Sequence, residues 1–194
     1  MMNKLHFLYP LLLLAACGQS QPDTAPLAGA RMGGAFTLTG GDGKTVRDTD
    51  FKGKYRLIYF GYTFCPDVCP TDVARNADAV DILAKAGTPA KQVFITIDPA
   101  RDTPEVLRDF AANLDPALIG LTGTEAQVKA ASDAYRIFYM ARNPGDEYYL
   151  LDHTTLTYLM QPAKDGTPTF MDFFKSDVAS QDMADRVACF AKAG

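Results

Sequence analysis

The sequence predicts an α/β domain in which a central mixed sheet is flanked by helices. Short apolar runs that are typical of buried strands alternate with segments whose apolar residues recur at helical spacing. Two further strands are expected before the last helix, and a β-hairpin is expected at the start of the domain. The sequence shows no internal repeat, and the roughly 160 residues of the domain are enough for one hydrophobic core.

The first half of the domain contains the hairpin, two central strands and one helix. Residues 36–39 alternate like a short strand, and the glycine-rich run 40–43 follows as a hairpin turn. Residues 56–60 and 93–97 are mostly apolar, as expected for strands covered on both faces. A helix that ends at Gly87 is predicted between them. Its apolar residues at helical spacing are Val73, Ala77, Val80 and Ala84.

The second half continues the alternation. Thr103 as N-cap and Pro104 at the first helical position predict a helix, whose core stripe is Leu107, Phe110 and Leu114. Residues 118–121 form a short strand, and Thr124 caps a helix that carries Val128, Ala131 and Tyr135. Strands are predicted over 156–160 and 169–173 with a turn at 165–166. The last helix is expected from about Asp177, with Ala179, Met183, Val187 and Phe190 facing inward.

The N-terminus predicts export from the cytoplasm. Lys4 precedes the apolar stretch 5–16, which is too short to span a bilayer and fits the apolar core of a secretory signal. Residues 14–18, Leu-Ala-Ala-Cys-Gly, resemble the lipobox of bacterial lipoproteins, in which cleavage leaves a lipidated cysteine as the first residue. The alternative is an ordinary signal peptide followed by an incidental cysteine.

This resemblance implies three segments. Residues 1–16 are a lipoprotein signal peptide, residues 17–34 are a flexible tether that begins with lipidated Cys17, and residues 35–194 are the folded domain. The protein is then lipid-anchored in the cell envelope, facing the periplasm or extracytoplasmic space. The formal net charge is −4 and no basic stripe is present, so nucleic acid is not an expected partner.

Two cysteines carry the most chemical information. Cys65 and Cys69 follow the first central strand directly, and their spacing brings both side chains onto one side of a helical turn. The two thiols can be oxidised together, can form a structural disulfide, or can bind one soft metal ion. Pro66 and Pro70 lack a backbone N–H, so we expect an irregular first coil and a regular helix from about Thr71.

His153 is the only histidine left once the signal peptide is removed. Two thiolates and one imidazole make a three-point site suited to copper, whereas a closed zinc site normally has four protein ligands. Cys189 is left over. It lies about 120° from the apolar stripe of the last helix, at 100° per residue, which predicts an exposed thiol.

The position of the cysteines also bears on the fold. Open α/β sheets place their functional sites at the carboxyl ends of central strands. A redox or metal motif directly after the first central strand is an arrangement found in the thioredoxin-like fold, and this is the fold that we predict.

Three segments together resemble the Sco/SenC family of copper-binding proteins, which serve assembly of the copper site in cytochrome c oxidase. These segments are 59–70, 93–105 and 151–154, in the family's order. The resemblance implies that Cys65, Cys69 and His153 bind copper, as Cu(I) or Cu(II). It also implies a partner, either the copper-receiving subunit of cytochrome c oxidase or another periplasmic copper protein. Phe64, where many members have histidine, departs from the family pattern, as do Met160 and Gln161.

Several polar residues near these motifs have two interpretations. Asp67 either tunes the site or caps the turn, and Asp152 either orients the second nitrogen of His153 or is a solvated surface residue. Turn and cap roles are favoured over partner docking for the acidic and basic residues of 98–102. Met160 is a soft potential ligand, but core packing is favoured.

Two functions follow from the same residues. The first is a membrane-tethered metallochaperone, with a monomeric soluble domain, that passes one copper ion to an oxidase subunit. The second is a thiol–disulfide oxidoreductase or redox sensor that uses the Cys65/Cys69 dithiol on a copper-site apoprotein. His153 discriminates between them, because only the chaperone needs a third ligand.

Overall fold

A computed structural model describes residues 27–28, 30–146, 148–162 and 169–193. Seven strands form the main sheet, in the order β2-β1-β5-β4-β3-β8-β9. Their bounds are β1 (Thr37–Gly40), β2 (Thr45–Arg47), β3 (Tyr55–Gly61), β4 (Ala90–Thr96), β5 (Ile119–Thr122), β8 (Thr157–Gln161) and β9 (Thr169–Phe174). β3, β4 and β5 are parallel and the other pairs are antiparallel, so the sheet is mixed, as predicted.

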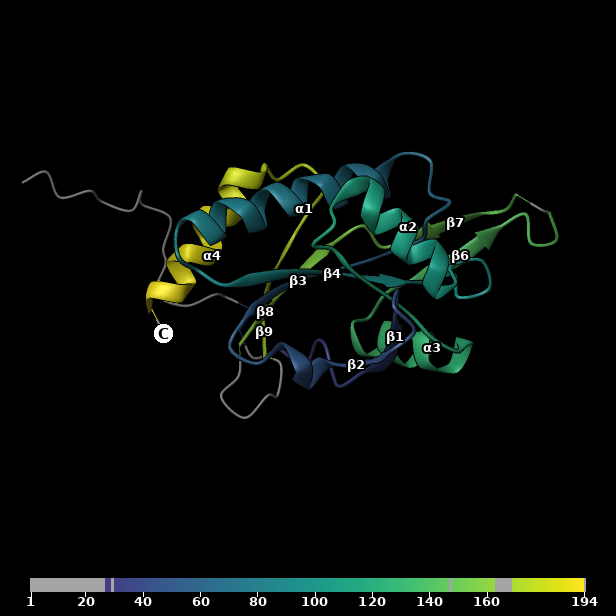
Figure 1. The fold of residues 1–194 in the computed structure, drawn as a ribbon, viewed down its shortest axis with the longest axis horizontal. Helices are drawn as coiled ribbons and strands as arrows, with labels where there is room; N and C mark the ends of the chain where they lie inside the picture. The colour runs from purple at the N-terminus through teal and green to yellow at the C-terminus, as the bar shows by residue number, and fades with distance from the viewer. Residues whose placement is uncertain (1–26, 29, 147, 163–168, 194) are drawn as a thin grey trace, which may run out of the picture.

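Helices cover both faces of this sheet (Figure 1). On one face lie α1 (Val68–Lys85), α2 (Pro104–Leu114) and α4 (Ser180–Ala193), and on the other lies α3 (Glu125–Ala134). A short 3-10 helix, η1 (Asp48–Phe51), follows the N-terminal β1–β2 hairpin. This element order confirms the predicted α/β class and the N-terminal hairpin.

β3 is the central strand that carries the cysteine motif. It pairs with β4 on one side and β8 on the other, and all seven of its residues are buried. The two hydrophobic clusters of the core draw on residues between Met32 and Ala191. The described domain therefore contains its own core, and the motif follows the strand that both clusters cover.

Helix α1 begins earlier than the sequence predicts. It starts at Val68, so Cys69 and Pro70 lie in its first turn rather than before it. The first N–H groups of a helix have no intrahelical partner, and a proline there removes no helical hydrogen bond. The prediction of a start near Thr71 was wrong because it treated Pro70 as a helix-interior residue.

The buried face of α1 also differs from the predicted one. Val73 is buried as expected, but Ala84 is exposed, and Asp72 and Asn76 take inward positions. Buried polar groups are tolerated where they are hydrogen-bonded, and both residues have partners on other elements. A pattern read from apolar residues alone does not detect such a face.

The last helix is close to its prediction. It starts at Ser180, a few residues after Asp177, and Ala179 is exposed in front of it. Met183, Val187 and Phe190 are buried as predicted.

A second, two-stranded sheet was not predicted. β6 (Tyr139–Arg142) pairs antiparallel with β7 (Leu150–His153), and this β6–β7 hairpin projects from one end of the domain in Figure 1. His153 was expected in a loop before a strand, but it is the last residue of β7. Each strand has only four residues, and none of the eight is fully buried, so the hydrophobic pattern that would reveal them is weak.

The N-terminal segment is described only in part. The predicted signal peptide, Cys17 and the predicted turn at 165–166 lie outside the described residues. At the end of the predicted tether, Met32 packs against the core, and the Gly33 N–H donates to the carbonyl of Ala134 at 2.9 Å. No helix within the described part of the chain is long and apolar enough to cross a membrane.

Candidate metal centre

Three side chains from separate elements meet at the carboxyl end of β3. Cys65 lies in the loop after β3, Cys69 in the first turn of α1, and His153 at the end of β7. One ligand atom from each lies within 4.8 Å of the other two. The structure thus brings together the three residues that the sequence singled out.

The thiol pair is buried and unequal in its proton affinity. The exposed fraction is 8% for Cys65 and 0% for Cys69, and the Cys69 N–H donates to Cys65 Sγ at 3.4 Å. Hydrogen bonds from the Cys69 thiol and from the Cys69 backbone N–H lower the pKa of Cys65 to about 4, against the effect of burial. The same contact with Cys65, together with burial, raises the pKa of Cys69. The pair therefore holds one thiolate, on Cys65, and one proton, on Cys69.

The imidazole presents a free nitrogen to the sulfurs. His153 Nδ1 is 2.9 Å from the carbonyl oxygen of Thr154, which can only accept, so we assign the ring proton to Nδ1. Nε2, 3.5 Å from Cys69 Sγ, then carries the lone pair that a metal needs. The ring lies edge-on to Tyr59 and Tyr62, with centroid separations of 6.3 and 5.9 Å. The ring is therefore fixed both by a hydrogen bond and by packing.

Gly61 leaves room for Cys69. A Cβ at Gly61 would lie 2.9 Å from Cys69 Sγ and 3.0 Å from both Phe94 and Tyr59. Any larger residue would displace one of these groups, so the glycine at the end of β3 sets the depth at which the thiol sits.

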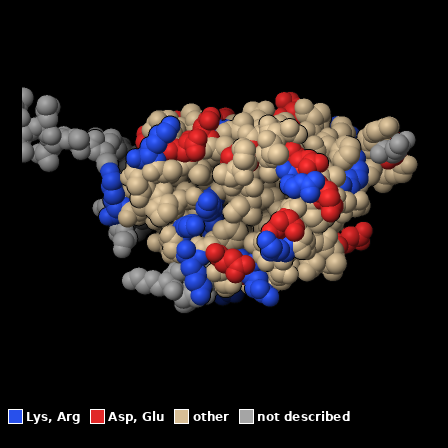
Figure 2. Space-filling model, viewed as in Figure 1, with Lys and Arg blue, Asp and Glu red and all other residues tan. Residues whose placement is uncertain are grey.

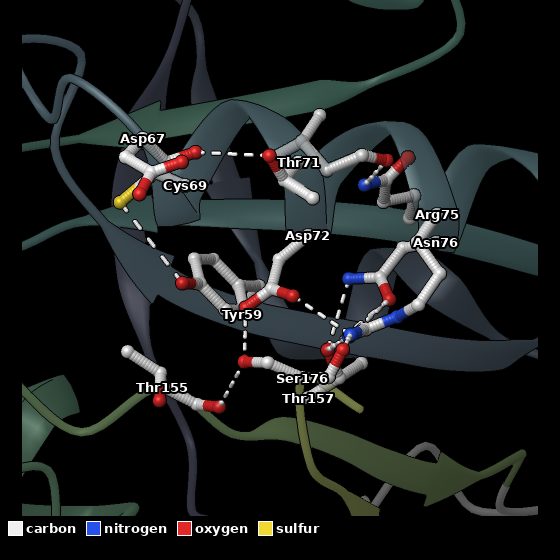
Figure 3. A network of polar contacts seen from close by, with 12 residues as sticks. Tyr59, Asp67, Cys69, Thr71, Asp72, Arg75, Asn76, Thr155, Thr157 and Ser176 are labelled. Carbon is white, nitrogen blue, oxygen red and sulfur yellow. Dashed lines mark hydrogen bonds and ion pairs between the residues drawn. The ribbon is translucent and has the colours of Figure 1, made fainter. Parts of the chain in front are cut away.

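A polar network continues behind Cys69 (Figure 3). The Tyr59 hydroxyl contacts Cys69 Sγ at 4.0 Å. Further along α1, Asp72 pairs with Arg75 at 2.7 Å and accepts from Ser176 Oγ at 2.8 Å. These contacts join the first turns of α1 to the segment after β9, and they hold the helix that carries Cys69.

The two acidic residues with open roles do not contact the three donor atoms through their side chains. Asp67 is the exposed N-cap residue of α1, and its side chain makes no cap hydrogen bond. Asp152 forms an ion pair with Arg142 across the β6–β7 hairpin. The orienting partner of His153 Nδ1 is the Thr154 carbonyl rather than Asp152.

The remaining candidates have structural positions. Met160 is fully buried in the core, which agrees with the favoured packing role. Cys189 is half-buried on α4, not exposed as expected, and it is outside the three-residue group.

Sequence reasoning missed a cluster beside the site. Arg101, in the loop after β4, pairs with Asp98 at 2.5 Å and donates to the carbonyl of Tyr149 at 2.9 Å. The sequence did carry a signal, an acidic and a basic residue three positions apart in the segment 93–105, but turn and cap roles were assigned to it. The contact with Tyr149 spans 48 residues and has no local signature.

Charges on the molecular surface are mixed. Figure 2 shows acidic and basic side chains interspersed over the face in view. The chemistry of the centre therefore rests on its donor atoms. Two sulfurs and one imidazole nitrogen can hold a soft metal ion, and the two sulfurs alone can form a disulfide.

Comparisons with known proteins agree with this geometry. A family model described as SCO1/SenC matches residues 24–192. Protein SenC of Rhodobacter capsulatus is 52% identical over 166 residues, which cover 86% of this chain and 73% of that protein. A mitochondrial SCO1 homologue of Arabidopsis thaliana is 41% identical, and the matched region covers 71% of this chain but 42% of that protein.

Solved structures are similar over most of the chain. Arabidopsis thaliana ScoI with copper bound has a TM-score of 0.76 at 34% identity, and the match covers 83% of this chain and 99% of that one. Bradyrhizobium japonicum ScoI with copper bound has a TM-score of 0.71 at 36% identity, covering 82% and 98%. The observed sheet and these likenesses confirm the predicted thioredoxin-like fold. The chain belongs to the SCO1/SenC family.

Proposed function

We propose that this chain is a membrane-tethered copper metallochaperone. It binds one copper ion through Cys65, Cys69 and His153 and delivers it to the copper site of cytochrome c oxidase. The observation that carries the proposal is the convergence of two sulfurs and one unprotonated imidazole nitrogen within 4.8 Å.

The donor set fits copper on chemical grounds. Thiolates are soft ligands that select Cu(I), and an added imidazole gives a site that also accepts Cu(II). Three donors around one metal at bond lengths near 2.1–2.3 Å stand about 4 Å apart. The observed separations need only a small inward movement, which fits a site that is largely formed before the metal arrives.

The position of the site supports the proposed delivery. The ligands lie on a loop, a helix start and a hairpin strand, and Cys65 retains an exposed fraction of 8%. An incoming thiolate or imidazole of an acceptor can replace these ligands one at a time. The acceptor, a copper-receiving oxidase subunit or another periplasmic copper protein, is inferred from the family resemblance.

The N-terminal segments complete the proposal. Removal of residues 1–16 and lipidation of Cys17 place the protein in the cell envelope, with 17–34 as the tether of a monomeric domain. The tether lets the metal centre reach an acceptor in the same membrane.

The test is an anaerobic copper titration of the reduced protein beginning after Cys17, beside its His153→Ala variant. We expect one tightly held copper ion per chain, and a loss of tight binding in the variant because two thiolates remain without the third donor. Circular dichroism checks that both proteins are folded. Unchanged copper affinity in the variant would contradict the ligand assignment.

A second function is favoured by the low pKa of Cys65. A thiolate at neutral pH is the attacking species in thiol–disulfide exchange. Cys65 would attack a disulfide of a copper-site apoprotein and release one of its thiolates. Cys69 would then attack Cys65 Sγ, release the second thiolate, and leave a Cys65–Cys69 disulfide. Two electrons pass to the partner. One of its two thiolates takes up the proton lost by Cys69, and the other is protonated by water or remains a thiolate according to its own pKa.

His153 separates the two functions. In an assay with a disulfide substrate, the oxidoreductase keeps its turnover in the His153→Ala variant, whereas the chaperone loses copper transfer. A wild-type protein that binds no copper but cycles its disulfide readily would establish the second function.

A further inference from the structure

We propose that Arg101 is a positioning residue that holds His153 at the metal centre. It does so by joining the β6–β7 hairpin to the loop that carries Cys65, called here the cysteine loop (residues 62–67). The inference rests on the proposed role of His153 as a copper ligand and adds the residue that fixes its place.

The β6–β7 hairpin makes few hydrogen bonds to the rest of the domain. It forms its own sheet and is not hydrogen-bonded to the seven-stranded one. Within the described residues, its hydrogen bonds to the body involve Tyr149, Leu151 and His153. A groove of about 440 Å³ is lined by residues of the hairpin, of α3 and of the 97–100 loop. Besides these hydrogen bonds, Tyr139 and Leu151 pack against the core, so few contacts of the hairpin backbone fix the place from which His153 reaches the sulfurs.

Arg101 contributes several of these contacts at once. Its guanidinium carbon lies 3.7 Å from the centre of the Tyr149 ring, and Nη1 donates to the Tyr149 carbonyl at 2.9 Å. Its Nε donates to Asp98 at 2.5 Å, and the Tyr149 hydroxyl donates to the same carboxylate at 2.8 Å. The exposed fraction of the side chain is 15% for Arg101 and 4% for Asp98, so the pair is shielded from water. These three residues form a closed triangle between the loop after β4 and the hairpin.

The other side of Arg101 faces the cysteine loop. The guanidinium carbon lies 4.8 Å from the Phe64 ring centre and 5.7 Å from that of Tyr62. The next residue, Asp102, is buried and accepts hydrogen bonds from the backbone N–H and hydroxyl of Thr63. One short loop thus contacts both halves of the metal centre, the half with the cysteines and the half with the histidine.

Arginine suits this role for a physical reason. Its planar guanidinium stacks on aromatic rings while its N–H groups donate in fixed directions, and lysine can do only one of these at a time. Loss of the guanidinium leaves the bond between Thr63 of the cysteine loop and Asp102 in place, but it removes the contacts of Arg101 with Tyr149 and so loosens the hairpin. The consequence is a broader distribution of the distances between His153 and the two sulfurs.

The test is a double-mutant cycle on the full chain in mild detergent, with copper affinity measured under reducing, anaerobic conditions. Arg101→Gln is expected to weaken copper binding by about tenfold to a hundredfold, the range for groups that orient a metal-bound histidine. In a His153→Ala background the same substitution is expected to have no further effect, because the ligand through which Arg101 acts is gone. If Arg101→Gln lowered copper affinity by the same factor in the wild-type and His153→Ala backgrounds, the proposal would be overturned.

Hydrogen exchange gives a readout without copper. In the metal-free protein, Arg101→Gln is expected to raise exchange at least tenfold for amides of 139–153, including Leu151, while β8 and α4 keep their protection. Unchanged exchange in the hairpin would overturn the proposed role of Arg101 even if copper binding changed. If the wild-type protein bound no copper, the proposed function would fail, but hydrogen exchange would still test whether Arg101 holds the hairpin.

Two further variants test whether the effect is specific to the contacts of Arg101. Tyr149→Phe removes the hydroxyl that donates to Asp98 and keeps the ring, so it is expected to act in the same direction by a smaller factor in a folded protein. The matched control is Arg142→Gln, which removes a cation of the same hairpin whose partner is the exposed Asp152. We expect this variant to leave copper affinity and hydrogen exchange unchanged. Effects of Arg142→Gln as large as those of Arg101→Gln would overturn the specific role.

Discussion

The two thiols of the motif differ because of their neighbours rather than their chemistry. Cys65 receives hydrogen bonds from the thiol and the backbone N–H of Cys69, whereas Cys69 is fully buried beside the Cys65 thiolate. The hydrogen bond between the two thiols favours the charged form of Cys65 and disfavours the charged form of Cys69. A metal that binds both sulfurs must displace the proton of Cys69, so binding releases a proton.

This difference predicts the pH profile of Cys65. An ordinary thiol becomes about tenfold more reactive per pH unit below its pKa of roughly 8.5, because only the thiolate reacts. With a pKa lowered to about 4, Cys65 is already ionised at pH 6. We expect its alkylation rate by iodoacetamide, followed by mass spectrometry on the reduced metal-free protein, to be nearly flat from pH 6 to 8.

The control is free cysteine alkylated in the same buffers. Partial burial of Cys65 lowers its absolute rate but not the shape of its profile. A tenfold rise per pH unit between pH 6 and 8 would contradict the low pKa.

At the residue scale, the three candidate ligands that the structure brings together could be singled out from the sequence, but the contacts that support them could not. Cys65, Cys69 and His153 stand out as rare, soft donors in short motifs. The partner of His153 Nδ1 is a backbone carbonyl, which every residue offers, so nothing in the sequence favours Thr154 over Asp152.

At the scale of elements, a polar contact as well as an apolar stripe holds α1 in position. Asn76 on the helix and Thr157 on β8 are both buried, and the Asn76 amide donates to Thr157 Oγ1 at 3.0 Å. Arg75 donates to the same hydroxyl at 3.3 Å. The helix that carries Cys69 is therefore held to the strand next to β3.

Thr157→Val is expected to destabilise the domain by about 1–3 kcal/mol. Valine keeps the shape of threonine but leaves the buried Asn76 amide without its partner, and an unpaired buried group loses its full solvation. The measurement is urea unfolding followed by circular dichroism.

The matched control is Thr169→Val on the adjacent strand β9, where the side chain is exposed. That change should stay within about 0.5 kcal/mol, as is usual for surface substitutions. An equal stability of the two variants would show that the Asn76–Thr157 contact contributes nothing net.

The unpredicted β6–β7 hairpin illustrates the limit of pattern reading for elements. Its strands are short and partly exposed, and its tertiary contacts come from residues such as Arg101 and Tyr62 elsewhere in the chain. Long, buried strands such as β3 and β4 were predicted because their apolar runs are continuous.

At the scale of the whole molecule, the proposed function needs a membrane attachment that lies outside the described residues. The described domain holds a complete core, and no helix within it can cross a bilayer. Attachment is proposed at Cys17 because residues 14–18 resemble a lipobox, and each acyl chain would contribute about 0.8 kcal/mol per buried methylene.

Cys17→Ser is expected to release the protein from membranes. Serine offers no thiol for lipidation, so the chain loses its anchor while the folded domain is unchanged. Membrane and soluble fractions of cells expressing each form are compared by immunoblot, with copper binding of the released protein as the check on folding. Continued membrane association of the variant would contradict the lipidated tether.

The sequence by itself determined the α/β class, most strand and helix positions, and the three candidate donor residues. These depend on local properties, namely apolar periodicity, caps and the chemistry of rare side chains. Only the tertiary structure decided that His153 sits on a hairpin, that its Nε2 lies 3.5 Å from a cysteine 84 positions earlier, and that Arg101 joins the two halves of the site. Such contacts depend on how the sheet and loops pack together, and residues far apart in the chain leave no shared local pattern.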